Sequence, residues 1–418
     1  MTLRSVLVLG AICLASLLLM LFFVLPADQQ YIDEAFHQAQ IQRFLDGDFS
    51  RVPQLTVLPG YHAAVTAMAW PAGIESLRGL RVLSALLALG GLMLALVWLQ
   101  RDGADRPLLR CLQILLCPII WPFWFLLYTD LASAALVMAG LLLLTAGRLL
   151  WLAALGVVAL AWRQTSLIWW GLFGLMALEQ SGLRSQFVGT NRSDPEQSWR
   201  VLAVAAWRLL LKVWPLLLPL VAFAVFVTVN DGIVVGDRAA HRIRGLNFLQ
   251  VYFMLLVVFV LLLPLHLANA PAIGRLLRRY PLLVILGLVM GVHYVTGFAI
   301  VHPYNDPGPG YFLRNQLLGL LDESIWLRIV SAFAIAWAAL SIAVTPLRRP
   351  AHYWLYPVTV LSLLTMGLIE QRYYIVPLML FLMFRQLRSD HLEWSLLAWA
   401  GLGSVLISWG IATMRFFP

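Results

Sequence analysis

Apolar runs of about the length that crosses a bilayer recur along the whole chain, and short polar segments separate them. A helix needs about 20 apolar residues to span the hydrocarbon core of a membrane. The pattern therefore predicts an all-α polytopic membrane protein with about 13 transmembrane helices, within a range of about 11 to 14. Because no polar stretch is long enough to form a separate soluble domain, we interpret residues 1–418 as a single membrane domain.

Two apolar segments need separate interpretation. The first run begins after Arg4 and ends near Leu25, and it resembles a signal peptide. It is too long for one and lacks a clear small-x-small cleavage site, so we expect an uncleaved first helix. The run from Val57 to Ile74 would, if counted as a span, reverse the side of every later loop. We expect it to form a helix that lies at the outer interface of the membrane or dips into it.

The arginines assign the loops to the two sides of the membrane. Most of them fall in alternate loops, as expected when cytoplasmic loops carry the excess of positive charge. The polar segment 179–200 lies on this cytoplasmic side. The outer loops are then 27–78, 128–130, 163–165, 230–247, 302–324 and 370–374. Most of the acidic residues and several histidines fall in these outer loops, which indicates chemistry at the outer face.

Composition supports the membrane interpretation and excludes two other classes of protein. The chain is 61% hydrophobic and 12% charged, with a mean hydropathy of +0.85, which is far too apolar for a soluble domain. The net charge of +9 does not indicate nucleic-acid binding, because the arginines are scattered among helix ends. Lys212 is the only lysine, which favours a GC-rich bacterial genome and hence a bacterial inner membrane with the outer face in the periplasm.

The three cysteines do not indicate a disulfide framework or a zinc site. Cys13, Cys111 and Cys117 lie in or beside apolar runs and have no Cys-x-x-Cys spacing. We expect them to be packing residues.

The first outer loop carries the strongest candidates for chemistry. On a helix, Asp33, Phe36, His37 and Gln40 share one face, which places a carboxylate beside an imidazole at the membrane boundary. Partial desolvation makes such a carboxylate a better proton acceptor, as general-base catalysis requires. The alternative is that Asp33 and Glu34 only cap a helix. One histidine with two acids is an incomplete set of metal ligands, so we expect no metal.

Charged residues also interrupt later apolar stretches. Asp130 either caps the helix that follows Tyr128 or projects towards a substrate. An unpaired Arg163 facing lipid would cost several kcal/mol, so it must meet an anion, water or a carboxylate. Glu370 and Arg372 either pair with each other or leave Arg372 free to bind a phosphate.

Two further outer loops contain polar residues beside glycine or proline. Gly236 and Asp237 follow a turn and could line a pocket. His302, with Arg314 downstream, brings an imidazole and a guanidinium to the outer mouth of the bundle. The alternative there is an aromatic belt at the membrane surface.

Together these segments resemble the α-1,2-glucosyltransferase family that adds the terminal glucose to the lipid-linked oligosaccharide of N-glycosylation from dolichyl-phosphate-glucose. The matching segments occur in the same order as in that family. They are Asp33-Glu34-x-Phe36-His37 with Gln38-Ala39-Gln40, Leu58-Pro59-Gly60, Tyr128-Thr129-Asp130, Arg163-Gln164-Thr165, Asn230-x-Gly232-Ile233-Val234-Val235-Gly236-Asp237, His302-Pro303 and Glu370-x-Arg372-Tyr373-Tyr374. The stretch after His302-Pro303 departs from the family pattern, which leaves acceptor recognition open.

The resemblance implies a GT-C architecture with interfacial helices in the first outer loop, and an inverting transfer without cofactor or metal. Its partners would be a polyprenyl-phosphate-linked sugar donor and a glycan or lipid-linked glycan acceptor. Family counterparts act in the endoplasmic reticulum membrane, facing the lumen. Asp33 and Glu34 are the catalytic candidates. The substrate-binding candidates are His37, Gln40, Tyr128, Asp130, Arg163, Gln164, Gly236, Asp237, His302, Arg314, Glu370, Arg372 and Tyr373.

Two alternatives remain at this level. A transporter or flippase for lipids or sugars would also carry intramembrane Arg and Glu, although the chain has no visible inverted repeat and its polar residues favour one side. A bacterial enzyme of the same class could instead move another sugar from an undecaprenyl-phosphate donor to a cell-envelope glycan.

Overall fold

The computed structural model describes residues 3–180, 213–237, 245–305 and 315–417, together with positions 204, 207 and 211. Throughout these residues the regular secondary structure is helical, so the predicted all-α fold is confirmed. The α-helices are α1 (Leu3–Leu19), α2 (Glu34–Leu45), α3 (Gly60–Ala69), α4 (Leu77–Arg101), α5 (Pro107–Leu115), α6 (Thr129–Thr145), α7 (Leu149–Trp162), α8 (Leu167–Gln180), α11 (Leu218–Asn230), α12 (Phe248–Leu261), α13 (Leu263–Ala268), α14 (Ala270–Arg279), α15 (Leu282–Thr296), α16 (Gln316–Glu323), α17 (Ile325–Val344), α18 (Leu355–Leu364), α19 (Ile375–Phe384) and α20 (Asp390–Ala412).

Short 3-10 or π turns precede or follow many of these helices. They are η1 (Met20–Val24), η2 (Trp70–Ala72), η3 (Trp121–Trp124), η4 (Gln164–Ser166), η5 (Trp214–Leu217), η6 (Pro303–Asn305), η7 (Pro350–Trp354) and η8 (Gln371–Tyr374). Two of these turns, η4 and η8, coincide with polar segments that interrupt apolar runs. They place polar backbone groups and side chains between helices inside the bundle. A continuous helix could not do this, because its backbone groups bond to each other.

Several described helices have the length and composition of membrane spans. Four qualify alone, namely α1 with η1, α4, α17 and α20, and the bent pair α14 and α15 would be a fifth. Other apolar helices, α6, α7 and α12 among them, have only 10–17 residues. At 1.5 Å per residue they are shorter than the bilayer core unless neighbouring segments extend them. The prediction of about 13 spans therefore stays a prediction.

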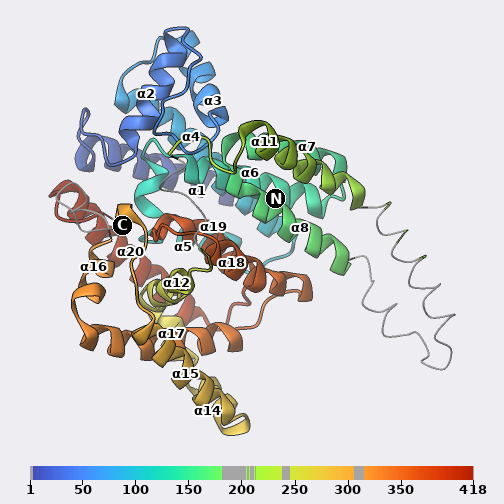
Figure 1. Cartoon of the computed structure of the whole chain (residues 1–418), viewed down its shortest axis with the longest axis vertical. Coiled ribbons are helices and arrows are strands. Elements are labelled where there is room, and N and C mark those ends of the chain that lie inside the picture. Colours follow the sequence, from blue (N-terminus) through green and yellow to red (C-terminus); the bar gives the residue numbers. More distant parts are fainter. Residues whose placement is uncertain are drawn as a thin grey trace.

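Helix α19 lies inside the bundle, where it contacts α5, α6 and α18 (Figure 1). Nearly every side chain from Ile375 to Phe384 is buried. The helix is apolar on all sides, as expected for a helix that is enclosed by others. Because η8 leads directly into α19, the residues of η8 are fixed at the end of the most buried of the described helices.

The helices α6 and α7 form an antiparallel pair beside α4, and their loop lies at the end remote from η4. The N-terminus of α6 and the C-terminus of α7 are therefore neighbours. Gly91 of α4 faces Ala135 of α6 so closely that a Cβ would overlap its side chain. This close packing fixes the two helix ends that contribute to the site described below.

The first outer loop folds into α2 and α3, which pack on each other and stand together at one end of the molecule (Figure 1). Helix α3 has ten residues and is about 15 Å long, too short to cross a bilayer. Gly60 begins α3 against the backbone of Ala161 and the ring of Trp162, where a side chain would not fit. The predicted turn at Pro59 and Gly60 therefore brings α3 against the end of α7.

The opposite end of α19 is held by a buried charge network. Arg385 pairs with Glu393 of α20 and also donates to Gln113, and all three side chains are buried. Arg110 donates to the carbonyls of Leu382 and Arg385 at distances of 2.9 and 2.8 Å, which caps the C-terminal end of α19. Some arginines that the sequence assigns to the cytoplasmic side thus also hold helix ends in place.

Candidate active site

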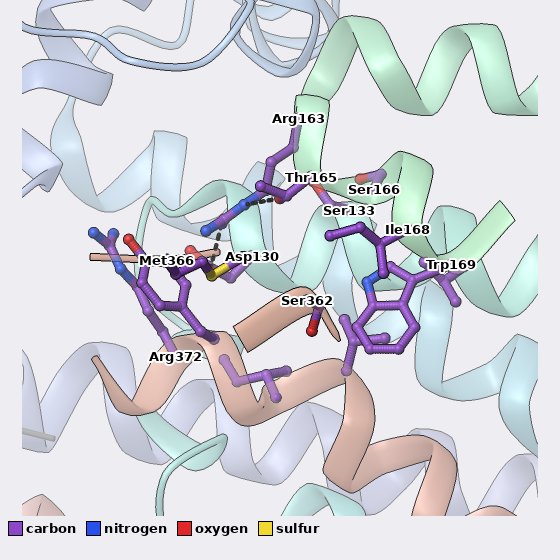
Figure 2. Close-up of a pocket in the computed structure, with 14 residues that line it drawn as sticks. Asp130, Ser133, Arg163, Thr165, Ser166, Ile168, Trp169, Ser362, Met366 and Arg372 are labelled. Atoms are coloured by element: carbon purple, nitrogen blue, oxygen red, sulfur yellow. Dashed lines mark hydrogen bonds and ion pairs between the residues drawn. The ribbon is translucent and has the colours of Figure 1, made fainter. Parts of the chain in front are cut away.

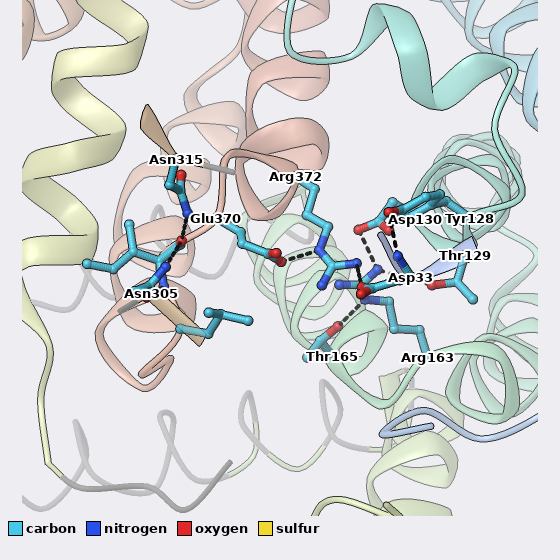
Figure 3. Close-up of polar contacts among 12 residues, drawn as sticks. Asp33, Tyr128, Thr129, Asp130, Arg163, Thr165, Asn305, Asn315, Glu370 and Arg372 are labelled. Atoms are coloured by element: carbon cyan, nitrogen blue, oxygen red, sulfur yellow. Dashed lines mark hydrogen bonds and ion pairs between the residues drawn. The ribbon is translucent and has the colours of Figure 1, made fainter. Parts of the chain in front are cut away.

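Charged side chains from four segments that are distant in sequence converge at the end of the bundle nearest α2 (Figure 3). They come from the start of α2, the start of α6, the end of α7 and the η8 turn. The charged members are Asp33, Asp130, Arg163, Glu370 and Arg372. Three carboxylates and two guanidiniums meet here, which gives the cluster a formal charge of −1 at neutral pH.

Asp33 occupies the N-cap position of α2, but its side chain makes no capping hydrogen bond. The carboxylate instead accepts from Nη1 of Arg372 at 2.6 Å. The hydroxyl of Tyr128 fixes the backbone nearby, because it accepts from the Asp33 N–H at 3.1 Å and donates to the Tyr31 carbonyl at 3.0 Å. The carboxylate of Asp33 is thus turned into the cluster, and the purely capping alternative does not describe its contacts.

Asp130 and Arg163 form an ion pair between the ends of α6 and α7. Asp130 lies in the first turn of α6, where the helix dipole stabilises negative charge. Arg163 follows the last turn of α7 in an extended conformation and also donates to the hydroxyls of Thr129 and Thr165, both at 3.2 Å. Of the three partners expected for Arg163, an anion, water or a carboxylate, the structure provides the carboxylate of Asp130.

Arg372 connects Glu370 of its own segment with Asp33 at the start of α2. Its Nε donates to Glu370, which is one of the two alternatives considered from the sequence, and its Nη1 donates to Asp33, a pair that the sequence did not suggest. Its guanidinium lies 5.7 Å from the ring centres of both Tyr128 and Tyr373. Aromatic faces stabilise a partly desolvated cation, which helps to hold Arg372 in a site with little water.

The segment that carries Glu370 and Arg372 is fixed by side-chain amides. Asn305 accepts from the N–H of Ile369 and donates to its carbonyl, both at 2.8 Å, and Asn315 donates to the same carbonyl. Gln250 of α12 donates to Leu368 and accepts from Tyr374. These bonds satisfy backbone groups of a non-helical segment inside the bundle, which is the condition for such a segment in a membrane protein.

A small pocket, with a cavity volume of about 40 Å³, opens beside the cluster and has two chemically different sides. Figure 2 shows Arg163, Asp130 and Arg372 at one side, with Ile168 and Trp169 at the other. The remaining lining residues are mainly apolar or small, and they are Ser133, Val137, Thr165, Ser166, Ser362, Met366, Tyr373, Ile375 and Val376. The pocket therefore places two guanidinium groups beside an apolar surface.

Glu34 lies next to Asp33 in sequence but not in the cluster. Its side chain is fully buried and forms an ion pair with Arg81, of which only 1% is exposed. The same carboxylate accepts from the backbone N–H groups of Tyr31 and Leu127 at 3.0 and 2.8 Å. Glu34 thus ties the start of α2 to α4 and to the segment before α6, and its oxygens are occupied by these donors.

We expect the substitution Glu34→Gln to destabilise the protein by about 3 kcal/mol, because it leaves the buried charge of Arg81 without a counter-charge. Thermal unfolding in detergent would measure the loss. The double variant Glu34→Gln/Arg81→Met removes both charges and should recover part of the stability. Equal stability of Glu34→Gln and the unaltered protein would contradict the structural role of this pair.

Gln40 and Gln164 hold backbone in the first outer loop. Gln40 accepts from the N–H of Val52 at 2.7 Å and donates to the carbonyl of Ser50 at 3.0 Å. Gln164 donates to the carbonyl of Thr56 at 3.3 Å. Both side chains fix the loop that follows α2.

The loop after α11 also packs on the first outer loop. Gly236 lies so close to the backbone carbonyls of Leu55 and Pro53 that a Cβ would overlap them. Asp237, next in the chain, accepts from the hydroxyl of Tyr304. The sequence interpretation that Gly236 and Asp237 line a pocket stays a prediction, and the structure gives both residues packing contacts.

We expect Gly236→Ala to cost about 1–3 kcal/mol, because a backbone carbonyl cannot move aside as a flexible side chain can. Gly171→Ala is the matched control, since nothing lies within 4 Å of a Cβ at this position in α8. The control should be neutral or slightly stabilising in a helix. Thermal unfolding of the two variants would measure the difference. Equal unfolding temperatures of Gly236→Ala and Gly171→Ala would contradict this packing role of Gly236.

In the outer loop 302–324, the predicted site residue His302 lies beside the η8 segment. The ring of His302 approaches Gly367, and its Nδ1 accepts from the N–H of Tyr304 at 3.1 Å. The neighbouring Asn305 binds Ile369 as described above. The predicted site residue Arg314 lies outside the described residues.

His37 borders the cluster from α2. Its Nδ1 is 2.9 Å from Nε2 of His62 in α3, and both rings are buried. Burial lowers the pKa of His37 to about 4, an effect that Asp33 and Asp130 oppose and Arg372 and Arg163 support. His37 is therefore uncharged at neutral pH.

Three residues that the sequence interpretation did not select also build the site. Arg81 lies near the start of a long apolar helix, where an arginine requires a buried partner, and this is the signal that could have found it. His62 and Asn315 carry no comparable signal in a single sequence. Among the described residues, no group of three or more His, Cys, Asp or Glu side chains is placed to hold a metal ion.

The described residues thus form a helical bundle of membrane type in which a cluster of carboxylates and arginines lies beside a pocket. Sequence comparison specifies the class as a glycosyltransferase. A sequence model of the DIE2/ALG10 family matches residues 27–383, and the chain belongs to this family. The family resemblance inferred from the short motifs is therefore confirmed.

Curated relatives over most of the chain carry one name, "Dol-P-Glc:Glc(2)Man(9)GlcNAc(2)-PP-Dol alpha-1,2-glucosyltransferase". The Arabidopsis thaliana protein is 27% identical over 93% of this chain and 91% of its own length. The Rattus norvegicus protein is 26% identical over 88% and 86%. The Candida albicans protein is 24% identical over 84% of each chain. A solved structure, ArnT from Cupriavidus metallidurans in the apo state, aligns with a TM-score of 0.41 and 16% identity over 98% of this chain and 71% of its own.

Proposed function

We propose that the protein transfers a hexose from a polyprenyl-phosphate-hexose donor to a glycan or lipid-linked glycan acceptor, with inversion at the anomeric carbon. The names of the relatives support glucose as the sugar and an α-1,2 linkage as the product. The positions of the arginine-bearing loops support an active site on the outer or luminal face. For a bacterial host, this is the periplasmic face of the inner membrane.

The observation that carries this proposal is the two-sided pocket at the charge cluster. A polyprenyl-phosphate sugar has an apolar chain, one phosphate charge and a polar sugar in that order. We assign the first isoprene units to the apolar side of the pocket and the phosphate to Arg163 and Arg372, because guanidinium groups bind phosphate oxygens through parallel hydrogen bonds. The sugar then lies towards Asp33, which is bonded to Arg372.

The reaction we propose is a single displacement. The oxygen of the acceptor hydroxyl bonds to the anomeric carbon while the bond from that carbon to the phosphate oxygen breaks. The hydroxyl proton passes to Asp33, and the lipid phosphate leaves with the bonding electrons. The arginines stabilise the charge that grows on the leaving phosphate. Since the donor is already activated by its phosphate, a base, a positioned acceptor and these cations supply the required chemistry.

In this account the Asp33 and Arg372 pair must open when the donor binds. The phosphate competes with Asp33 for Nη1 of Arg372, and a carboxylate released from its counter-ion is a better proton acceptor. Donor binding therefore prepares the base. Of the two acids at the start of α2, we assign the base to Asp33 and a positioning role to Glu34, whose oxygens are occupied by Arg81 and two backbone N–H groups.

The proposal is tested by incubating the purified protein with a panel of donors and a lipid-linked glycan acceptor, with products analysed by mass spectrometry. The panel contains polyprenyl-phosphate glucose, mannose and galactose, and the corresponding nucleotide sugars. We expect transfer from a polyprenyl-phosphate hexose and none from nucleotide sugars. Movement of lipid or sugar across proteoliposomes without any transfer product would instead favour a transporter.

A further inference from the structure

A short basic helix takes no part in the reaction proposed above. Helix α14 carries Arg275, Arg278 and Arg279 within its ten residues. In Figure 1, α14 and α15 lie at the opposite end of the molecule from α2 and α3. The sequence contains no aspartate or glutamate from Leu263 to Thr296, which covers α13, α14 and α15. The positive charge of α14 is therefore not balanced by acids on its own helix or on the two helices that flank it in the sequence.

The start of α14 is fixed at the end of the bundle away from the charge cluster. Asn269, the N-cap residue of α14, donates to the hydroxyls of Ser341 and Thr345 at 2.8 and 2.9 Å, and it accepts from Arg388. Arg388 lies just beyond the C-terminal end of α19, whereas the cluster lies at the η8 turn before its N-terminal end. Helix α14 is thus on the side that the arginine-bearing loops assign to the cytoplasm.

Helix α14 has one apolar and one basic face. With 3.6 residues per turn, Ile273, Leu276 and Leu277 fall on one side of the helix and the three arginines on the other. Ile273 is 1% exposed and Leu276 and Leu277 are half-buried, and the helix packs on α13, α15 and α17. All three arginines are exposed. The apolar face thus holds α14 on the bundle, and the basic face points away from it.

The three guanidiniums make only local contacts. Arg278 donates to the carbonyl of Gly274 in its own helix at 3.2 Å, and the guanidinium of Arg279 lies 5.4 Å from the ring centre of Tyr280. Within the part of the chain that the structure describes, none of the three forms an ion pair with a carboxylate. Their remaining N–H groups can therefore bind an external anion.

The direction of α14 follows from the helix after it. Helix α15 is apolar, and its side chains Leu282, Ile285 and Leu288 are 74%, 58% and 59% exposed, as expected for a helix that faces lipid. The chain bends by 108° between α14 and α15, so the two helices are nearly perpendicular. Helices that cross a bilayer are tilted by about 20° from its normal on average. With α15 crossing, α14 lies closer to the plane of the membrane than to its normal.

We propose that α14 is an interfacial helix whose arginines bind the headgroups of anionic phospholipids in the cytoplasmic leaflet. Three arginines would be costly in the hydrocarbon core, whereas phosphate oxygens at the membrane surface accept from guanidinium groups. Tyr280 is half-exposed at the bend between α14 and α15, where an aromatic side chain is typical of the boundary between lipid and water. This inference is independent of the sugar transfer, because α14 lies at the other end of the bundle.

The test places the photoreactive residue p-benzoylphenylalanine at position 280, in the full chain reconstituted into vesicles of equal parts phosphatidylglycerol and phosphatidylcholine. After irradiation, mass spectrometry measures the ratio of the two lipid adducts. We expect about 10-fold or more phosphatidylglycerol, since each arginine near anionic lipid contributes about fivefold. The variant Arg275→Gln/Arg278→Gln/Arg279→Gln should give nearly equal adducts. The corresponding triple lysine variant should keep most of the preference, because lysine keeps the charge.

The matched control is Arg4→Gln/Arg101→Gln/Arg148→Gln, which removes the same charge from three other exposed arginines at the ends of separate helices. It should keep the phosphatidylglycerol preference at position 280. Equal adducts of the two lipids without any arginine substitution would overturn the proposal, as would an unchanged preference in the α14 glutamine variant. Adducts with a second copy of the chain in place of lipid would also overturn it, because α14 would then be a protein interface.

Discussion

Replacing Asp33 by asparagine is expected to reduce kcat by about 10²–10⁴-fold, the contribution typical of a positioned general base. Asparagine has nearly the same shape and can still contact Arg372, but it cannot take the proton of the acceptor hydroxyl. Donor binding should be retained or even tightened, because the variant no longer presents a charge that competes with the phosphate for Arg372. Initial rates of transfer and equilibrium binding of the donor would measure the two effects separately.

Asp46→Asn is the matched control, since Asp46 lies at the exposed C-terminal end of the same helix. It should leave both rate and donor binding unchanged. The folded fraction of Glu34→Gln should also transfer sugar at a measurable rate, despite its lower stability. Full activity of Asp33→Asn, or loss of activity in Glu34→Gln without loss of folded protein, would contradict the assignment of the base.

Replacing Arg372 by alanine is expected to weaken donor binding by about 10²-fold or more. Removing one member of a buried hydrogen-bonded charge pair costs about 2–5 kcal/mol, and each 1.4 kcal/mol corresponds to a factor of ten. The variant also leaves Asp33 and Glu370 without their shared counter-ion. Arg372→Lys should have an intermediate effect, because lysine keeps the charge but not the planar fork. Titration with a polyprenyl-phosphate hexose would measure the affinities.

The control for Arg372 is Arg349→Ala. Arg349 also pairs with a carboxylate, that of Asp102, but it lies far along the bundle in the loop before η7 and is half exposed. Its loss should leave donor affinity unchanged. If Arg372→Ala bound the donor as tightly as Arg349→Ala, the phosphate would have to lie elsewhere.

Much of the site could be predicted from the sequence because polar residues in apolar surroundings are costly. Asp33, Asp130, Arg163, Glu370 and Arg372 each interrupt or border an apolar run, and each requires a partner for this reason. The structure brings all five together. Their pairing could not be predicted, because 339 positions separate Asp33 from Arg372 and hydrophobic periodicity does not specify which helices pack together.

The sequence also could not predict the different roles of adjacent residues. Asp33 and Glu34 are neighbours of nearly the same chemistry, yet one faces the cluster and the other pairs with Arg81. The difference arises from the direction of two side chains on one helical turn, which depends on tertiary packing. Likewise, the sequence does not reveal that His62 contacts His37, because the loop between α2 and α3 has no periodic pattern that fixes how the two helices approach each other.

The helices themselves followed the hydrophobic pattern, but their ends did not. The run from Val57 to Ile74 contains a helix of only ten residues, and the stretch around Arg163 breaks into two helices joined by a 3-10 turn. In both places the backbone bends so that polar groups reach the site. Apolar runs predict that helices exist in a membrane protein, whereas the breaks depend on which backbone groups find partners.

A direct displacement by an acceptor hydroxyl that Asp33 deprotonates determines the anomeric configuration of the product, and this configuration can be measured. A donor of known configuration, labelled with ¹³C at the anomeric carbon, would be converted by the purified protein, and the one-bond carbon–proton coupling of the product would be measured by NMR. We expect the product to have the opposite configuration to the donor. Retention of configuration would contradict this mechanism, because a single displacement from the side opposite the leaving phosphate inverts the anomeric carbon.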